Sequence, residues 1–196
     1  MSVFVKICGL TDAQGIAAAV SAGADAVGFV FYEKSSRNLD ISTAIELMSS
    51  VPAGLTKVAV MLHPDATYCS EVLAAIRPDA LQTDAADFDY ISLPDDVSAW
   101  PVIREDNGAI ADELPELYLY EGSASGVGEL VDWRRASELA SRGRMILAGG
   151  LSASNVATAI RQVQPWGVDV SSAVESAPGR KDAGMIREFI AAARAT

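Results

Sequence analysis

Apolar segments of strand length alternate with segments of helical periodicity about eight times along the chain, and the connections between them are short. Because neighbouring parallel strands need a crossover, usually a helix, this alternation favours a parallel sheet, and the number of repeats suggests that the sheet closes. We therefore predict an α/β fold of the (β/α)₈ or TIM barrel type, with an open doubly wound sheet as the rival. The expected strands are 3–8, 26–31, 57–62, 80–82, 101–104, 116–121, 144–148 and 168–173.

Stripes of apolar residues at helical spacing follow most of these strands. Thr11 and Gln14 have the spacing of a capping box, which predicts the start of the first helix. The acidic segment 84–89 is too short for a full helix, so a compact barrel with shortened or irregular fourth and fifth helices is expected. Further helices are expected after Asp40, from 65 to 76, from 133 to 141, after Ser152 and around Met185. The expected core-facing helix positions are Ile16, Ala19, Val20, Ile41, Ala44, Ile45, Met48, Val156, Ala159, Ile160, Val163, Met185, Ile186, Phe189 and Ile190.

The bulk composition is that of one globular domain. The 196 residues are 50% hydrophobic and 21% charged, and no linker interrupts them, so residues 1–196 are expected to form a single barrel domain. This length lies at the lower limit of ~200 residues for such barrels, which leaves room for few insertions. No run is long and apolar enough to span a bilayer, and the N-terminus lacks the regions of a signal peptide, so a cytoplasmic location is expected.

The charge and the cysteine count restrict the partners and cofactors. A formal net charge of −11 argues against nucleic acid and membranes, because their negative charge needs a basic surface. An anionic small molecule would instead need locally placed N–H groups and arginines. Cys8 and Cys69 are too few for a disulfide framework, and His63 is the only histidine beside them, so no metal site is expected. The sequence leaves the oligomeric state open.

Two loops have the character of a phosphate site. In the first, the apolar strand end 147–148 runs into two glycines and then Ser152, where a helix is expected to begin. Glycines bring backbone N–H groups close to an anion, and a helix start directs partial positive charge at it. The second loop is the end of segment 168–173. Loops after the seventh and eighth barrel strands often bind phosphate together with a short extra helix, although ordinary turn chemistry would also explain the glycines. The expected phosphate-binding residues are Gly149, Gly150, Ser171 and Ser172.

Active sites of such barrels lie at the C-terminal ends of the strands. Lys6 and Cys8 are two residues apart on one expected strand, so they point to the same face. If that face is the barrel interior, the ammonium would lower the pKa of the thiol and favour the thiolate, which would make Cys8 a base. The alternative is that Cys8 is a buried small hydrophobic residue, as most free cysteines are and as we expect of Cys69.

Four further polar residues follow expected strands. Glu121 ends an apolar strand before the glycine-rich loop 122–128, and a carboxyl that keeps its proton there could act as a general acid. The alternative is a solvated carboxylate at the rim. Arg37 could hold a carboxylate through two hydrogen bonds, or could lie on the surface. Asp169 lies at the end of the last strand, and His63 is interpreted as a turn residue.

Several motifs follow one another in a fixed order. They are Lys6–Thr11, Gly28–Phe31, Ser35–Arg37, Asp132–Trp133, Leu147–Val156, Asp169–Ser172, Val174–Glu175 and Gly179–Asp182. Together they resemble the phosphoribosylanthranilate isomerase family, a TIM barrel family of tryptophan biosynthesis. The resemblance covers nearly the whole chain, and its strength lies in the ordered set of motifs.

The resemblance implies a cofactor-free Amadori rearrangement of N-(5-phosphoribosyl)anthranilate to 1-(2-carboxyphenylamino)-1-deoxyribulose 5-phosphate. An acid opens the ribose ring, and a base takes the proton from C2′. By resemblance, Cys8 is the base, Glu121 is the acid, Arg37 holds the anthranilate carboxylate and Asp169 lies beside the substrate. The phosphate lies on Gly149, Gly150, Ser171 and Ser172.

Three positions depart from the family pattern. Glu121 stands where the family usually has aspartate, which extends the reach of the carboxyl by one methylene. The segment 81–84 stands where the family has Gln-Leu-His-Gly, so this side of the pocket lacks a histidine and is expected to have a different shape. Ala173 replaces a glycine in the loop after the eighth strand.

Two rival functions stay open. The first is a non-catalytic phosphate-binding barrel, which would keep the anion site without isomerase activity. The presence of Cys8 and of a carboxyl at position 121 argues against this function. A related aminoaldose isomerase of histidine biosynthesis would use the same chemistry on a larger substrate with two phosphates. Against it, glycine-rich phosphate chemistry is clear only in the second half of the chain.

Overall fold

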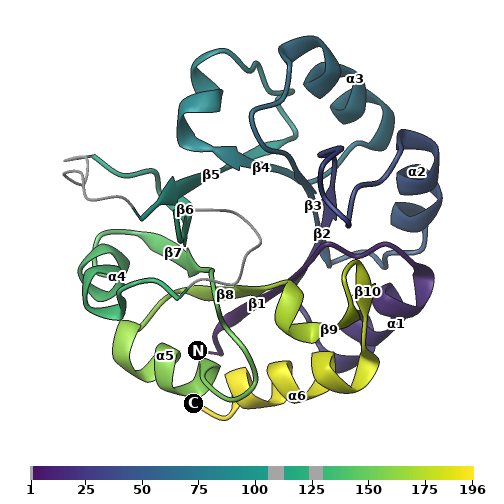
Figure 1. Cartoon of the computed structure of the whole chain (residues 1–196). Coiled ribbons are helices and arrows are strands. Elements are labelled where there is room, and N and C mark those ends of the chain that lie inside the picture. The colour runs from purple at the N-terminus through teal and green to yellow at the C-terminus, as the bar shows by residue number, and fades with distance from the viewer. Residues whose placement is uncertain (1, 106–112, 124–129) are drawn as a thin grey trace.

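The strands of this chain form one closed parallel barrel (Figure 1). The computed structural model describes residues 2–105, 113–123 and 130–196. Each strand pairs with the next along the chain, and the last pairs with the first. The predicted TIM barrel is therefore confirmed, and the open doubly wound sheet is excluded. The strands are β1 (Phe4–Cys8), β2 (Ala26–Val30), β3 (Thr56–Val60), β4 (Ala80–Asp84), β5 (Ser98–Arg104), β6 (Leu117–Glu121), β7 (Arg144–Leu147) and β8 (Gly167–Val170).

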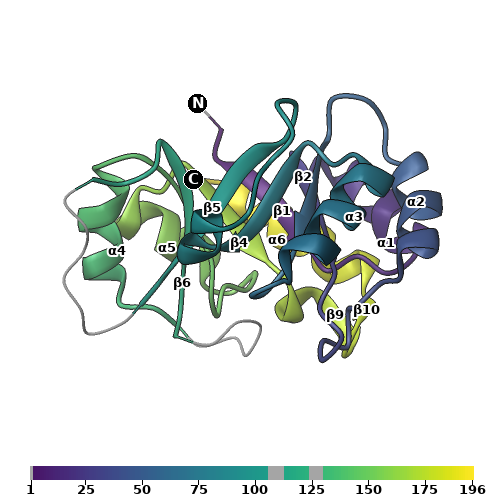
Figure 2. The ribbon, with the colours of Figure 1, turned by 90° about the horizontal axis from the view of Figure 1, so that it is seen from above.

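Helices surround the barrel, as Figure 1 and the view from above in Figure 2 show. Their buried stripes pack on the outside of the strands, whose residues are largely buried and mostly apolar. The α-helices of the described residues are α1 (Ala13–Ala22), α2 (Ile41–Ser49), α3 (Ala66–Ile76), α4 (Trp133–Ala140), α5 (Val156–Val163) and α6 (Ala183–Arg194). After β8 come the 3₁₀ helix η2 (Ser172–Val174) and a hairpin of β9 (Glu175–Ala177) and β10 (Arg180–Lys181).

The first helix is capped by a different residue from the one predicted. The side chain of Asp12, not that of Thr11, accepts a hydrogen bond from the backbone N–H of Gly15. Thr11 Oγ1 donates instead to the backbone oxygen of Gly179, in the hairpin after β8. The capping-box prediction is wrong because this contact between distant segments uses the threonine hydroxyl, and the adjacent carboxylate serves as the cap.

The helix expected after Ser152 begins later, at Val156. Asn155 Oδ1 accepts from the backbone N–H of Ser152 at 2.8 Å, and Asn155 Nδ2 donates to the backbone oxygen of Gly150 at 2.9 Å. These two bonds fold the segment into a turn before the helix. The N-terminus of α5 is therefore farther along the chain from the glycines than predicted.

Two expected core positions lie at the edges of their helical stripes. Ile45 on α2 is 47% exposed, and Met185 on α6 is 36% exposed. Their neighbours Met48 and Ile186 are buried, so each helix has a narrower apolar face than its sequence suggested.

The connection after β4 is short, as predicted. It holds the 3₁₀ helix η1 (Ala85–Asp89) in place of a full α-helix, because the acidic segment offers too few residues to cross the barrel surface. The expected irregular fifth helix falls mostly on residues 106–112, which lie outside the described residues. Most of the glycine-rich loop at 122–128 does as well.

The barrel interior is apolar at one end and polar at the other. Phe4 stacks on Trp166 with ring centroids 4.5 Å apart and meets Trp100 edge-on at 6.0 Å, so aromatic rings fill the N-terminal end. Apolar side chains continue this filling: Ala26, Val58, Ala80, Val102, Leu119 and Ile146. Because side chains alternate along a strand, further inward positions lie beyond this layer, and on five of the strands they include polar residues. These are Cys8, Gln82, Arg104, Glu121 and Asp169.

Arg194 at the end of α6 joins the two ends of the chain. Its guanidinium donates to Ser2 Oγ and to the backbone oxygens of Val3 and Gly23, and it forms an ion pair with Asp25 at 2.6 Å. The two termini therefore lie close together (Figure 1). In the part of the chain that the structure describes, no helix has both the length and the apolar character needed to cross a membrane.

Candidate active site

A pocket opens at the C-terminal ends of the strands, where the inward polar side chains gather. Its volume is about 330 Å³, which is within the range of sites for small molecules. The loop after β2 and the end of β3 form part of its wall, through residues 34–37 and 60–62. The structure brings five of the predicted site residues together in its lining. These are Cys8, Arg37, Glu121, Asp169 and Ser171.

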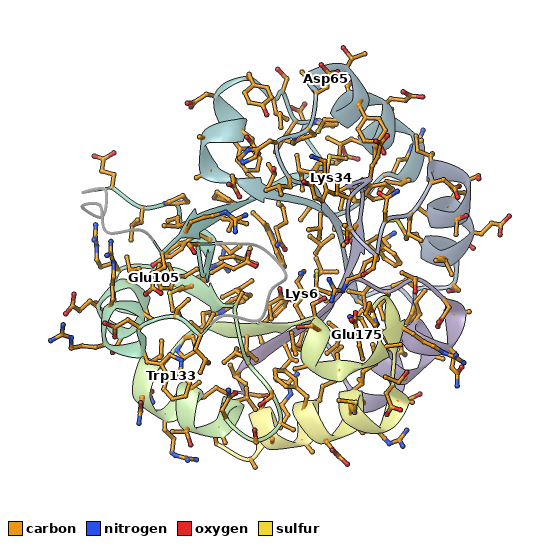
Figure 3. All side chains as sticks on the ribbon, in the orientation of Figure 1. Lys6, Lys34, Asp65, Glu105, Trp133 and Glu175 are labelled. Carbon is orange, nitrogen blue, oxygen red and sulfur yellow. The ribbon has the colours of Figure 1, made fainter. Side chains whose placement is uncertain are left out.

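Lys6 is fully buried and forms an ion pair with Asp169 on the neighbouring strand β8. The distance from Nζ to Oδ1 is 2.9 Å, and the two residues are register partners. Burial alone would lower the pKa of Lys6, but the nearby carboxylate of Asp169 and the thiol of Cys8 outweigh it, and the pKa is raised. A charged ammonium therefore lies inside the barrel, where Figure 3 labels Lys6.

The thiol of Cys8 is less acidic than the sequence suggested. Burial raises its pKa above the ordinary value; Lys6 and Lys181 lower it, and Asp169 raises it further. The predicted effect of Lys6 has the right sign, but the prediction that the thiolate is favoured is wrong. The ammonium already has a carboxylate partner, and it cannot offset the desolvation of a buried thiol. At neutral pH Cys8 is a thiol.

Gly28 on β2 provides the space for this pair of side chains. A Cβ atom at position 28 would lie 2.9 Å from Cys8 Sγ and 3.2 Å from Lys6 Cε. Any larger residue would push the thiol and the ammonium out of place. Gly28 therefore leaves the space that the side chain of the candidate base, Cys8, occupies.

Arg37 is held by Glu175 and is not a surface side chain. Its side chain is 13% exposed; Nε donates to Oε1 at 2.7 Å, and Nη2 donates to Oε2 at 2.9 Å. Lys181 forms a second ion pair with Glu175 at 2.8 Å. Burial would raise the pKa of Glu175, but its hydrogen bonds to Arg37 and Lys181 lower it, so the carboxylate stays charged. The contact uses two of the five N–H donors of the guanidinium.

The hairpin after β8 brings Glu175 and Lys181 to this place, and Figure 3 labels Glu175 there. Gly179 at the turn has a φ of 78°, and a Cβ atom on it would lie 2.4 Å from the backbone oxygen of Ser36. This close contact with the loop after β2 requires glycine. Lys181 Nζ also donates to the backbone oxygen of Ser171 at 3.0 Å. The segment 179–182 therefore fastens the loop after β8 to the loop that carries Arg37.

The four predicted phosphate-binding residues follow β7 and β8, which are neighbours in the barrel. Gly149 and Gly150 have φ values of 86° and 61°, a conformation that glycine adopts without strain. Within the described ranges, the backbone N–H groups of Gly149, Gly150 and Ser172 donate to no protein acceptor. Ser171 lines the pocket, and its hydroxyl donates to the backbone oxygen of Cys8 at 3.1 Å. A short helix, η2, begins at Ser172, as such phosphate sites often have.

Glu121 ends β6 and lines the pocket, with its side chain 14% exposed. Its Oε2 lies 3.5 Å from Nη1 of Arg104, which is its register partner on β5. Arg104 also holds Asp84 at the end of β4, since Nε lies 3.0 Å from both carboxylate oxygens and Nη2 lies 2.5 Å from Oδ1. The candidate acid is therefore part of a charged cluster and is not a solvated rim carboxylate.

His63 does more than form a turn. Its φ of 45° fits a turn, but its Nδ1 lies 2.9 Å from Asp87 Oδ1 and its Nε2 lies 3.4 Å from Asp84 Oδ2. The hydrogen bond that His63 donates to the Asp87 carboxylate is the largest of the effects that raise the pKa of the imidazole. The family pattern places a histidine on the fourth strand. Here a histidine from the loop after β3 reaches the end of that strand, although 62% of its side chain is exposed.

Sequence reasoning gave no role to several charged residues around the pocket. Glu175 and Lys181 belong to matched motifs, but nothing local in the sequence links them to Arg37, which lies 138 positions from Glu175. Asp84 and Arg104 carry opposite charges at the ends of two consecutive strands. The expected fifth strand ends at Arg104 as observed, but the expected fourth strand, 80–82, ends before Asp84, so the sequence did not predict their ion pair.

Comparisons with known proteins agree with this architecture. A family model described as N-(5'phosphoribosyl)anthranilate (PRA) isomerase matches residues 5–192. The chain is 41% identical over 220 residues to the N-(5'-phosphoribosyl)anthranilate isomerase of Paracoccus denitrificans, with 100% of this chain and 99% of that protein covered.

Two solved structures share the fold. The phosphoribosyl anthranilate isomerase from Thermotoga maritima matches with a TM-score of 0.83 and 29% identity over 99% of this chain and 100% of that chain. A phosphoribosyl anthranilate isomerase in complex with reduced 1-(o-carboxyphenylamino)-1-deoxyribulose 5-phosphate matches with a TM-score of 0.82 and 28% identity, over the same shares of the two chains. The chain belongs to the N-(5'-phosphoribosyl)anthranilate isomerase family.

Proposed function

We propose that the chain converts N-(5-phosphoribosyl)anthranilate into 1-(2-carboxyphenylamino)-1-deoxyribulose 5-phosphate, an aldose–ketose isomerisation of tryptophan biosynthesis. One observation carries the proposal: a thiol, Cys8, and a carboxyl, Glu121, line the same pocket. The rearrangement needs an acid and a base around one bound substrate, and it needs no cofactor. The relative solved in complex holds a reduced form of this product.

The two residues divide the proton transfers. Glu121 gives its proton to the ribose ring oxygen, the C1′–O bond breaks, and the anilino nitrogen forms a double bond to C1′. The Cys8 thiolate then takes the proton from C2′, and the electrons of that bond move through C1′ to the nitrogen. The enolamine that results becomes the ketone by tautomerisation. The productive form of the site is therefore the one with Glu121 protonated and Cys8 ionised.

Charged groups around the pocket would orient the substrate. Arg37, fixed on one edge by Glu175, has its remaining N–H donors for the anthranilate carboxylate. The backbone N–H groups of Gly149, Gly150 and Ser172, together with Ser171, would hold the phosphate. Asp169 binds Lys6 through Oδ1 and lines the pocket, so its other oxygen would accept a bond from a ribose hydroxyl.

Turnover of the substrate tests the function. Purified protein mixed with N-(5-phosphoribosyl)anthranilate is expected to abolish anthranilate-type fluorescence at a rate proportional to protein concentration. Glu121→Gln is the matched control, because the amide keeps the shape of the side chain but has no proton to deliver. A folded wild-type protein that leaves the fluorescence unchanged would reject the function.

The same assay separates the two rivals. A phosphate-binding barrel without activity would bind the substrate and leave it intact. An isomerase of histidine biosynthesis would turn over the aminoaldose with two phosphates faster than the anthranilate compound, so both substrates are run side by side. The cytoplasmic location expected from the sequence stays part of the proposal.

A further inference from the structure

Three charged side chains meet at the C-terminal ends of β4, β5 and β6. They are Asp84, Arg104 and Glu121, with side-chain exposures of 15%, 19% and 14%. All three point inward by the alternation of their strands, and Glu121 lines the pocket. At this exposure the charges act on one another with little screening by water.

The guanidinium of Arg104 is shared unequally between the two carboxylates. Asp84 makes three contacts with it, at 3.0, 3.0 and 2.5 Å. Glu121 makes one contact at 3.5 Å, which is at the outer limit of a hydrogen bond. By its contacts Arg104 is thus mainly the partner of Asp84, while its charge also acts on Glu121.

This division matters because an arginine paired closely with a carboxylate stabilises the charged form of the carboxylate. A general acid must instead carry a proton when the substrate binds. We propose that Asp84 is a positioning residue for the acid: by binding Arg104 it prevents full pairing of Arg104 with Glu121 and keeps Glu121 able to hold its proton. The proposal rests on the proposed function, in which Glu121 is the acid.

Other ionisable groups lie in or next to the pocket that Glu121 lines. Cys8 of β1 and Asp169 of β8 line the same pocket, and Lys6 is paired with Asp169. From the loop after β2 come Lys34 and Arg37, and Arg37 is paired with Glu175. Behind Asp84 lies His63. Lys6 and Arg37 have carboxylate partners of their own. Arg104 contacts both Asp84 and Glu121, so a substitution of Asp84 changes how its charge is divided between them.

The pH profile of turnover reports this balance. A carboxyl ordinarily loses its proton at lower pH than a thiol, and the pKa of Cys8 is raised. The productive form, with the carboxyl protonated and the thiol ionised, is therefore a minor form of the singly protonated pair. This form appears when the pair loses its first proton, which comes mainly from Glu121. The rise of kcat/KM with pH at the acidic end of the profile, here called the low-pH limb, therefore reports the ionisation of Glu121. The plateau of kcat/KM is proportional to the population of the productive form. It falls as the proton affinity of Glu121 drops further below that of Cys8.

Two variants are expected to move the low-pH limb in opposite directions. Asp84→Asn releases Arg104 to Glu121, so the limb moves to lower pH by about one unit, and the plateau of kcat/KM falls about tenfold for each unit. Arg104→Gln removes the cation, so the limb moves to higher pH. The double variant is expected to bring the limb back towards that of Arg104→Gln, since the proposed action of Asp84 on Glu121 requires Arg104. Substrate ionisation is common to all variants and cancels in the comparison.

Asp89→Asn is the matched control, because it removes the same charge from an exposed residue of η1 and is expected to leave the profile unchanged. If the low-pH limb stays in place, or moves in the same direction in both single variants, the role of Asp84 is overturned. Turnover by the wild-type protein would still support the proposed function in that case. Wild-type turnover combined with full activity of Glu121→Gln would overturn the role of Glu121 as acid, and the inference with it. Loss of activity by disordering alone would lower the plateau without moving the limb, which also overturns it.

Discussion

Glu175 occupies one edge of the Arg37 guanidinium, with Nε at 2.7 Å from Oε1 and Nη2 at 2.9 Å from Oε2. Two parallel bonds fix the plane of the guanidinium as well as its position. The donors on its other edge therefore have a set direction before any ligand arrives. Pre-set direction is what a site needs in order to bind a planar carboxylate.

Arg37→Lys is expected to raise KM about tenfold or more while kcat changes less, because a point charge replaces the fork and the reacting atoms are untouched. Glu175→Gln is expected to raise KM in the same direction, since the guanidinium loses the charged partner that orients it. Steady-state kinetics measure both effects. Arg180→Lys, at an exposed position of β10 in the same hairpin, serves as the control. An unchanged KM in Arg37→Lys would place the substrate carboxylate elsewhere.

Cys8→Ala is expected to lower kcat by at least ~10²-fold, the usual loss when a general base is removed, and to leave the fold intact. Circular dichroism checks the fold. The second cysteine offers a control: Cys69 is buried in α3, away from the pocket, so Cys69→Ala should keep its turnover. Near wild-type turnover of Cys8→Ala would remove the thiol from the mechanism.

The raised pKa of Cys8 predicts how this thiol reacts with an alkylating agent. Only the thiolate is alkylated, and a raised pKa makes the thiolate scarce at neutral pH and more abundant as the pH increases. In the Cys69→Ala background, the rate of inactivation by iodoacetamide should be slow at pH 7 and should still be rising above pH 9. A rate that levels off below pH 9 would mean that the site stabilises the thiolate.

Glu121→Gln is expected to lose most activity, because the amide forms hydrogen bonds but donates no proton to the ring oxygen. Glu121→Asp is expected to keep only part of it, since the shorter side chain stops one methylene short of the position that Glu121 reaches. Single-turnover rates on purified variants measure both. Turnover of the amide variant close to wild type would exclude Glu121 as the acid. An aspartate variant faster than wild type would keep the acid role and remove the need for the longer reach.

Inorganic phosphate or sulfate is expected to inhibit competitively, by binding to the N–H groups after β7 and β8. Gly149→Ala should weaken both this inhibition and substrate binding, because alanine is strained at a φ of 86°. Inhibition constants for phosphate in the two proteins provide the comparison. A sulfate-soaked crystal with no anion at Gly149, Gly150, Ser171 and Ser172 would contradict the assignment.

Local patterns were enough to predict the barrel and its strands. Each strand of the barrel is a short apolar run, and period and length identify such runs one at a time, as for 26–30, which is buried throughout. Side chains at the ends of strands were predicted as well, since a parallel barrel collects all such ends at one mouth. This is why the sequence predicted that Cys8, Glu121 and Asp169 lie at one end of the barrel, and all three line the pocket there.

What the sequence did not predict depends on contacts between distant segments. Thr11 does not cap the first helix, because its hydroxyl donates to the backbone oxygen of Gly179. Burial raises the pKa of the Cys8 thiol, and a local sequence pattern does not report the extent of burial. The partners of Arg37 and Glu121 were missed for the same reason. Each is held by a side chain from another loop or strand, and the choice among possible partners follows from distances that only the closed barrel sets.

Arg194 joins the end of α6 to the segment before β1, and α6 packs against α1 while β1 pairs with β8. The first and last units of the chain are thus held as firmly by each other as by their neighbours in sequence. Such a ring has no free end from which it can fray, so loosening any one unit exposes two others. Thermal unfolding should accordingly be a single cooperative transition, in which the mouth and the closed end of the barrel are lost together.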